Sequence, residues 1–80
     1  MNFYYVYILK LADGNYSIGR TDDLIRRIKE HKLGQERTTR RFLPCKLVTY
    51  LAFDSNKRAS KFENYLKTGS GFAFRNRHLT

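Results

Sequence analysis

The sequence predicts an α+β fold: a three-stranded antiparallel sheet flanked by helices, in the order ββαβα with a short C-terminal helical segment. Two runs rich in β-branched and aromatic residues stand near the start, on either side of a glycine turn. Two stretches with apolar residues at helical spacing follow, and a third alternating run lies between them. Because the first two strands are joined by a tight turn and the third returns after a helix, we expect an antiparallel sheet covered by helices.

The first two strands are predicted at residues 3–9 and 16–19. The first, FYYVYIL, contains the residue types that favour strands. It leads into the turn signal DGN at residues 13–15, where Gly14 supplies a positive φ at little steric cost. The second strand ends on Gly19, and a glycine at such a place commonly marks a bulge or the close approach of another backbone or ligand.

The first helix is expected to begin after a cap formed by Thr21 or Asp22 and to end at Gly34. His31 lies in its last turn, where the helix dipole favours positive charge. Residues 35–41 are polar and strongly basic, which predicts a mobile loop. The apolar positions of the helix recur at helical spacing, at Leu24, Ile25 and Ile28.

The third strand is predicted at residues 46–53 and a second helix at about residues 57–67. One of residues 54–56, which are Asp, Ser and Asn, would cap this helix. The tail should begin with a glycine turn at residues 68–71 and end in a short basic helical segment. The apolar face of the second helix would consist of Ala59, Phe62 and Leu66.

Length and charge limit what such a chain can do. Residues 1–80 suit a single domain, because a chain of this size buries only about 60% of the surface that it exposes when unfolded. Sixteen Lys and Arg against seven Asp and Glu give a formal charge of +9, which favours a polyanionic partner, nucleic acid first. A solvated basic surface and an anionic membrane are the alternatives, but no apolar run approaches the ~20 residues of a membrane span.

Cys45 is the only cysteine, so no intrachain disulfide can form, and we interpret it as a small hydrophobic residue. The first eleven residues lack the basic start, apolar stretch and cleavage site of a signal peptide. Both observations make a cytoplasmic location the expectation.

Phosphodiester chemistry is the reaction that a basic surface suggests, although the sequence has no P-loop, HExxH, CxxC or GxSxG motif. Such cleavage needs a group that activates the nucleophile, a cation that holds the phosphate and a divalent metal that offsets charge on the leaving oxygen. Tyrosine, arginine and glutamate side chains could fill these roles.

Five segments, in order along the chain, resemble those of the GIY-YIG nuclease family. YVY at residues 5–7 looks like the GIY element, and SIG at residues 17–19 falls where the family has YIG. Residues 19–31 resemble the family's helix, which carries an arginine and often a histidine one turn later. Residues 59–67 resemble the helix that presents the metal-binding glutamate. The entry to the next strand is matched by Thr39, Pro44, Leu47 and Val48.

The resemblance covers nearly the whole chain. It is that of a small standalone member, similar to the N-terminal nuclease domain of the bacterial excision-repair endonuclease. It implies catalytic roles for Tyr7, the GIY tyrosine, and Arg27, the family arginine. The family's tyrosine helps to activate the attacking water or, in some members, attacks the phosphate itself.

His31 follows Arg27 by four residues, so both project from one helix face and could converge on a phosphate. Without the resemblance, Tyr7 would be a core aromatic, Arg27 a solvated charge and His31 a cation at a helix end.

Glu63 corresponds to the family's single metal-binding carboxylate. Together with waters and substrate oxygens it would hold Mg²⁺ or Mn²⁺. The alternative is a surface ion pair with Lys67 at i+4. The residues expected to bind nucleic acid are Arg20, Arg37, Arg40, Arg41, Lys67, Arg75, Asn76 and Arg77.

Ser17 departs from the family pattern, because it stands where the second motif tyrosine would be. Tyr16 precedes it, but successive side chains in a strand point to opposite faces, so Tyr16 fills the site only if a bulge shifts the register. We count Ser17 among the catalytic residues because its hydroxyl can still form hydrogen bonds.

The expected function is therefore a metal-dependent DNA endonuclease acting on branched or damaged DNA in repair, recombination or mobile-element processing. The alternative is a nucleic-acid-binding module that kept the fold and lost efficient cleavage at Ser17. RNA stays open as the partner, since a basic face with aromatics does not distinguish the sugars. A monomer or a weak homodimer is expected.

Overall fold

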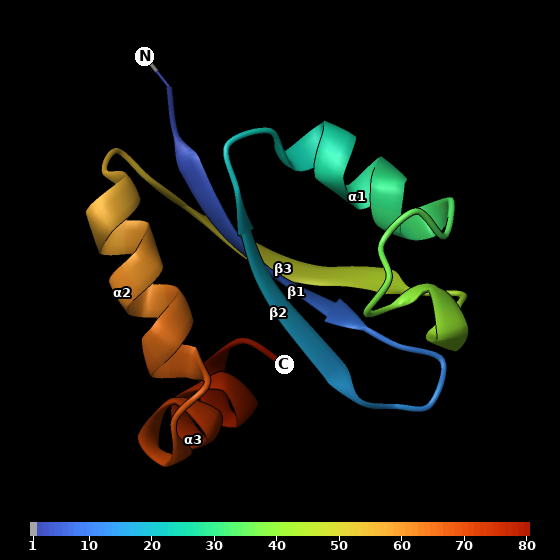
Figure 1. The fold of residues 1–80 in the computed structure, drawn as a ribbon. Coiled ribbons are helices and arrows are strands. Elements are labelled where there is room, and N and C mark those ends of the chain that lie inside the picture. Colours follow the sequence, from blue (N-terminus) through green and yellow to red (C-terminus); the bar gives the residue numbers. More distant parts are fainter. Residues whose placement is uncertain (1) are drawn as a thin grey trace.

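The central strand of the sheet is the first one in the chain. The computed structural model describes residues 2–80 and has the predicted α+β fold, with strand order β2-β1-β3 and both pairings antiparallel (Figure 1). The elements are β1 Tyr4–Lys10, β2 Tyr16–Thr21, α1 Leu24–Lys32, a 3₁₀ turn Arg40–Phe42, β3 Lys46–Phe53, α2 Asn56–Leu66 and α3 Gly69–His78.

Strand β1 is buried on both of its faces. Val6 and Ile8 point to the side covered by α2 and α3, where they pack with Ala59 and Leu66. The alternate residues Tyr7 and Leu9 point to the opposite side, which α1 covers with Leu24 and Ile28. Figure 1 shows the same arrangement, with α1 on one side of the sheet and α2 and α3 on the other. The period-two alternation of β1 therefore places Tyr7 under α1.

The hairpin between β1 and β2 closes as predicted. Gly14 has a φ of +88°, and the carboxylate of Asp13 accepts a hydrogen bond from the backbone N–H of Asn15 at 3.0 Å. The cap of α1 lies one or two residues later than predicted, because Thr21 still belongs to β2 and pairs with Tyr5. The side chain of Asp23 is the cap, and it accepts from the N–H of Arg26 at 3.1 Å.

Residues 35–41 form turns rather than the mobile loop that their polarity predicts. The carbonyl of Glu36 accepts from the N–H groups of Thr39 and Arg40, and the carbonyl of Thr39 accepts from the N–H of Phe42 at 2.9 Å. The N–H of Ala12 in turn bonds to the carbonyl of Phe42 at 2.8 Å, which joins this segment to the hairpin. Thr39 is thereby buried against α1.

The second half of the chain is close to the prediction. The hydroxyl of Ser55 caps α2, and the apolar face of that helix, Ala59, Phe62 and Leu66, packs on the sheet. The predicted glycine turn is wrong, because α3 starts directly at Gly69 after a cap by Thr68. None of the helices described in residues 2–80 combines the length and the apolar character that crossing a membrane requires.

Gly71 explains why the tail is helical despite its glycines. A Cβ at Gly71 would lie 1.7 Å from the backbone carbonyl oxygen of Tyr65, so only glycine lets α3 approach the end of α2 this closely. A Cβ at Gly69 would meet nothing within 4 Å. Gly71 is therefore a packing residue.

We predict that Gly71→Ala lowers the free energy of unfolding by about 3 kcal/mol, the upper end of the usual range for overpacking, because backbone must move. Gly69→Ala is the matched control in the same helix and should be neutral or stabilising by up to ~1 kcal/mol. Urea denaturation of both variants measures the difference. Equal effects at the two glycines would contradict this packing.

Candidate active site

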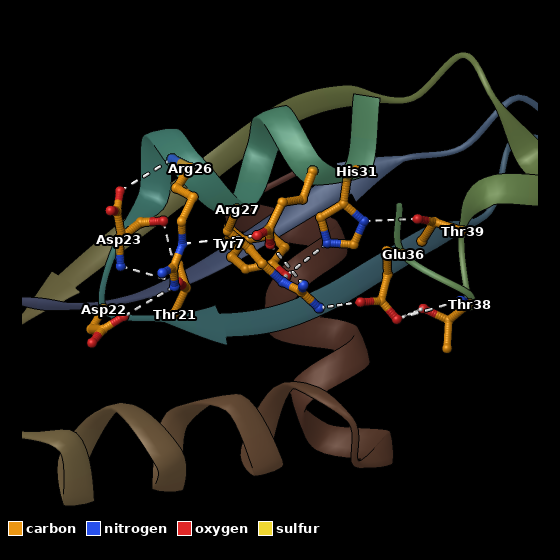
Figure 2. Close-up of polar contacts among 11 residues, drawn as sticks. Tyr7, Thr21, Asp22, Asp23, Arg26, Arg27, His31, Glu36, Thr38 and Thr39 are labelled. Atoms are coloured by element: carbon orange, nitrogen blue, oxygen red, sulfur yellow. Dashed lines mark hydrogen bonds and ion pairs between the residues drawn. The ribbon is translucent and has the colours of Figure 1, made fainter. Parts of the chain in front are cut away.

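Tyr7 is the centre of a buried polar cluster between β1 and α1 (Figure 2). Only 2% of the residue is exposed, and its hydroxyl oxygen lies 2.9 Å from Nε2 of His31. Nε of Arg27 donates to the same oxygen at 3.3 Å. The prediction that Arg27 and His31 share one helix face is confirmed, but the two side chains converge on the tyrosine hydroxyl.

Gly19 makes room for this hydroxyl from the neighbouring strand. It pairs with Tyr7 in the sheet, and a Cβ at Gly19 would lie 2.3 Å from the phenolic oxygen. Any side chain there would collide with the ring end of Tyr7. The glycine of the SIG element thus marks a close approach, but the approaching group is the side chain of Tyr7 and not the backbone or ligand that the sequence predicts.

The hydrogen-bond directions within the cluster follow from the donors. Arg27 has only N–H donors, so the oxygen of Tyr7 accepts there and its own proton can point to Nε2 of His31. Nε2 accepts this proton when the neutral imidazole carries its hydrogen on Nδ1. Nδ1 lies 2.7 Å from the hydroxyl oxygen of buried Thr39, which can accept that hydrogen. Thr39 can therefore support the tautomer that serves Tyr7.

Burial sets the protonation states of the pair. It raises the pKa of Tyr7 above its ordinary value of 10.0, although the hydrogen bond and charge of Arg27 oppose the shift. Burial, followed by the nearby charge of Arg27, lowers the pKa of His31 below 6.5, with Glu36 and Glu30 opposing. At neutral pH the phenol is protonated and the imidazole is neutral. The neutral imidazole can accept a hydrogen bond from the Tyr7 hydroxyl.

Arg27 joins the buried cluster to the surface. Its guanidinium donates to the carboxylate of Glu30 at 3.1 Å and to that of Glu36 at 2.5 Å (Figure 2). Burial acts to lower the pKa of Arg27, but hydrogen bonds to Tyr7 and the two carboxylates outweigh it and raise the pKa. In return, the hydrogen bond from Arg27 lowers the pKa of the Glu36 carboxyl. Two carboxylates therefore bind the guanidinium of Arg27, which the sequence predicts to bind a phosphate.

Glu63 lies on α2, across the sheet from α1. Nε of Arg20 lies 3.2 Å from one of its carboxylate oxygens, and Nζ of Lys67 lies 3.3 Å from the other. Arg20 also donates to the side-chain oxygen of Asn56. The charge of Glu63 is near enough to contribute to the raised pKa of Tyr7. The ion pair with Lys67 that the sequence allows as an alternative is present.

The chemistry of Glu63 fits a hydrated divalent ion. Within residues 2–80, no three His, Cys, Asp or Glu side chains gather into a group that could enclose a metal. A single partly buried carboxylate offers hard oxygen ligands, which suits Mg²⁺ or Mn²⁺, ions that keep several waters and take further oxygens from a substrate. Arg20 and Lys67 would have to turn away from the carboxylate.

Ser17 and Tyr16 lie on opposite faces of β2, as the alternation rule requires. Ser17 pairs with Leu9 and so shares the face of Tyr7, whereas Tyr16 packs into the cluster under α2 and α3. The pairing of β1 with β2 has no bulge, since the one register shift in the sheet is between β1 and β3. Tyr16 therefore does not replace the missing tyrosine.

The predicted nucleic-acid contacts are spread over three parts of the molecule. Arg37, Arg40 and Arg41 are exposed on the turns after α1. Arg20 and Lys67 flank Glu63, and Asn76 and Arg77 are exposed on α3. Arg75 differs from the rest, because it is buried and packs against two aromatic rings.

Thr39 and Glu36 are site residues that the sequence does not reveal as such. Both come from the segment predicted as a loop, and both reach α1 through side-chain contacts at a separation of eight or nine residues. From the sequence, Thr39 is notable only because it matches a residue that precedes the third strand in the GIY-YIG family. A polar basic segment gives no signal for which of its residues will be buried.

Comparisons with known proteins agree with the resemblance seen in the sequence. A family model described as the GIY-YIG catalytic domain matches residues 3–76. The UPF0213 protein BH0048 of Halalkalibacterium halodurans is 42% identical over 65 residues, which are 80% of this chain and 69% of that protein. The UPF0213 protein HQ_3675A of Haloquadratum walsbyi is 34% identical over 68 residues, covering 84% and 76%.

A solved structure supports the same relationship. The solution NMR structure of the UPF0213 protein BH0048 from Bacillus halodurans superposes with a TM-score of 0.61 at 36% sequence identity. The match covers all of this chain and 86% of that one.

We predict that the lowered pKa of His31 makes stability depend on pH. Because the folded pKa lies below the unfolded value of about 6.5, the unfolded state binds more protons in this window, so unfolding free energy falls as pH falls through it. His31→Gln should flatten this dependence in urea denaturation between about pH 5 and pH 8. His78→Gln removes an exposed histidine and should keep the dependence; an unchanged slope in His31→Gln would contradict the assignment.

Proposed function

The chain belongs to the GIY-YIG catalytic domain family, and from this we propose that it is a divalent-metal-dependent nuclease that cuts DNA phosphodiester bonds. The observation that carries the proposal is the meeting of Tyr7, His31 and Arg27 at one hydroxyl oxygen. A tyrosine that serves only the core does not need a neutral buried histidine as its hydrogen-bond acceptor. The same geometry suits a phenol that exchanges protons during a reaction.

In the proposed reaction, Tyr7 and His31 move protons away from the nucleophile. A water forms a bond to the phosphorus while the bond from phosphorus to the leaving oxygen breaks. The water passes a proton to the phenolic oxygen, the phenol passes its own proton to Nε2 of His31, and the leaving oxygen takes a proton from solvent. The imidazole becomes a cation, and Thr39 holds its other N–H. Because the phenol has a raised pKa, it starts protonated, so the acceptor role of His31 is required rather than optional.

Arg27 is the proposed phosphate ligand, and Glu36 is its competitor. The guanidinium can hold two phosphate oxygens in its planar fork, as it holds carboxylates in the free protein. A substrate phosphate would displace Glu36, which lies on the turns after α1. Arg27 is partly exposed, whereas Tyr7 and His31 are buried, so a phosphate on Arg27 would lie on the solvent side of the cluster.

Glu63 is the proposed ligand of Mg²⁺ or Mn²⁺. A bound divalent ion would offset negative charge on the phosphate and on the leaving oxygen. Arg20 and Lys67, which pair with Glu63 in the free protein, are then released toward the nucleic-acid backbone. The exposed arginines at positions 37, 40 and 41 would extend that contact along the strand.

Ser17 favours a second candidate, a nucleic-acid-binding module with weak or no cleavage. It lies on the face of Tyr7, where the family has a second phenol, and no neighbouring tyrosine takes that place. The arrangement of Tyr7, His31 and Arg27 nevertheless has no evident use in a module that only binds. We therefore place the nuclease first.

We predict that the protein with Mg²⁺ or Mn²⁺ cuts branched, nicked or supercoiled DNA. Tyr7→Phe should lower the rate by at least ~100-fold, because a general acid–base group is lost. Glu63→Gln should abolish metal-dependent cleavage, because the proposed metal ligand is lost. DNA binding by both variants should stay near wild type. Asp54→Asn, which removes an exposed carboxylate just before α2, is the matched control for charge. Gel analysis of the products measures the rates.

Two results would contradict the proposal. Full activity of Glu63→Gln would remove this carboxylate from the site. Intact DNA binding with no product from any substrate would leave the binding module as the function.

A further inference from the structure

A cleft lies beside the proposed cutting site, between the start of β2 and the corner where α2 meets α3. Its volume is about 530 Å³, and it is lined by Asn15, Tyr16, Ser17, Lys67, Phe72 and Arg75. Lys67, on its rim, forms the ion pair with Glu63 at 3.3 Å. The cleft and the carboxylate therefore adjoin each other.

Arg75 is a buried charge in this cleft without a carboxylate partner. It is 7% exposed, and in residues 2–80 its side chain donates only to the amide oxygen of Asn76, at 3.2 and 3.3 Å. Its guanidinium stacks on two rings, 4.3 Å from the centre of Phe72 and 5.0 Å from that of Tyr16. Among the described residues, every fully buried side-chain nitrogen has a hydrogen-bond partner. The third guanidinium nitrogen of Arg75 has none, so it must be exposed to solvent. Arg75 is one of the residues that line the cleft.

The buried charge of Arg75 would be compensated by an anionic ligand. Burying a charge without an opposite charge is costly, because the lost hydration is not replaced. The two rings hold the plane of the Arg75 guanidinium, one of whose nitrogens is left free to bind an acceptor, and Lys67, which also lines the cleft, adds a second cation. An anion with several oxygens, such as a phosphate diester, satisfies both cations.

The aromatic wall of the cleft adds a second kind of contact. Phe72 is 46% exposed, so its ring is open to contact from outside the molecule. Exposed aromatic rings beside cations are the usual elements of single-strand binding, since every base has a face that can stack on a ring. A base within a duplex is already stacked on both faces and is not free to do so.

We propose that this cleft binds one unpaired nucleotide of the DNA strand, with its phosphate on Arg75 and Lys67 and its base on Phe72. The site adjoins Glu63, so the nucleotide would flank the bond that the proposed nuclease cuts. In this respect the inference rests on the proposed function and narrows it. The preferred substrate is DNA with a frayed, flapped or branched single-stranded part.

The test measures DNA binding in the absence of divalent metal, so that the DNA is not cleaved during the measurement. The probes are a short fluorescein-labelled single-stranded oligodeoxynucleotide and a blunt duplex of the same sequence, followed by fluorescence anisotropy. Phe72→Leu keeps an apolar side chain and should weaken binding of the single strand by about fivefold or more, because one base stack is lost. Tyr65→Leu removes a similarly exposed ring from α2 and should leave binding unchanged.

The phosphate contact has its own readout. Lys67→Gln should lower the slope of log K against log salt for the single strand by about 0.7, the value of one phosphate contact. Arg58→Gln, which removes an exposed cation from the far end of α2, should leave the slope unchanged. Arg75→Lys keeps the charge but loses the planar stack, and it should weaken single-strand binding while its thermal unfolding confirms that it folds.

Equal losses in Phe72→Leu and Tyr65→Leu, or equal losses for the single strand and the duplex, would overturn the proposal. The outcome is independent of the cleavage assay. A protein that cuts DNA but binds single strands without Phe72 keeps its proposed function and loses this site. A protein that never cuts but loses single-strand binding in Phe72→Leu keeps the site and loses the nuclease reaction.

Discussion

The burial of one phenolic hydroxyl is the constraint on which the rest of the site depends. Strand β1 has no solvent-facing side, so Tyr7 must lie between the sheet and α1, where its hydroxyl needs partners. The chain meets this need from three directions, with the imidazole of His31, the guanidinium of Arg27 and the space left by Gly19. A core residue thus becomes the meeting point of ionisable groups.

This constraint also explains how the site is connected to the surface. His31 is fixed from behind by Thr39, which is buried because the residues after α1 fold back as turns. Arg27 is held from the solvent side by Glu36, which comes from the same turns. One short segment therefore contacts both the histidine and the arginine of the cluster. In the proposed reaction, a substrate phosphate competes with Glu36 and leaves Thr39 in place.

The sequence predicts the fold well where local patterns decide it. The β-branched run of β1, the turn at Gly14 and the apolar face that includes Ala59 and Leu66 all match the structure. Local patterns fail to predict the structure where a contact with a residue distant in sequence determines the conformation. Thr21 cannot cap α1 because it is paired with Tyr5, and the glycines of the tail are helical because Gly71 must pack on a carbonyl of α2.

The same distinction applies to the site. Family resemblance selects Tyr7, Arg27 and His31, and the structure brings these three together. It does not indicate that they meet at a hydroxyl rather than at a phosphate position, because that depends on the burial of β1. The buried stack of Arg75 likewise follows from the packing of α3 beside β2, which no local pattern encodes.

The protonation state of His31 is the most direct test of the proposed proton transfer from Tyr7. Nitrogen-15 NMR of the imidazole at neutral pH distinguishes a ring nitrogen that carries hydrogen from one that accepts a hydrogen bond. We expect a neutral ring with hydrogen on Nδ1, facing Thr39, and with Nε2 as the acceptor for Tyr7. Thr39→Val should shift the hydrogen toward Nε2. A ring that already carries hydrogen on Nε2, or on both nitrogens, in the unaltered protein would contradict the proposed proton transfer.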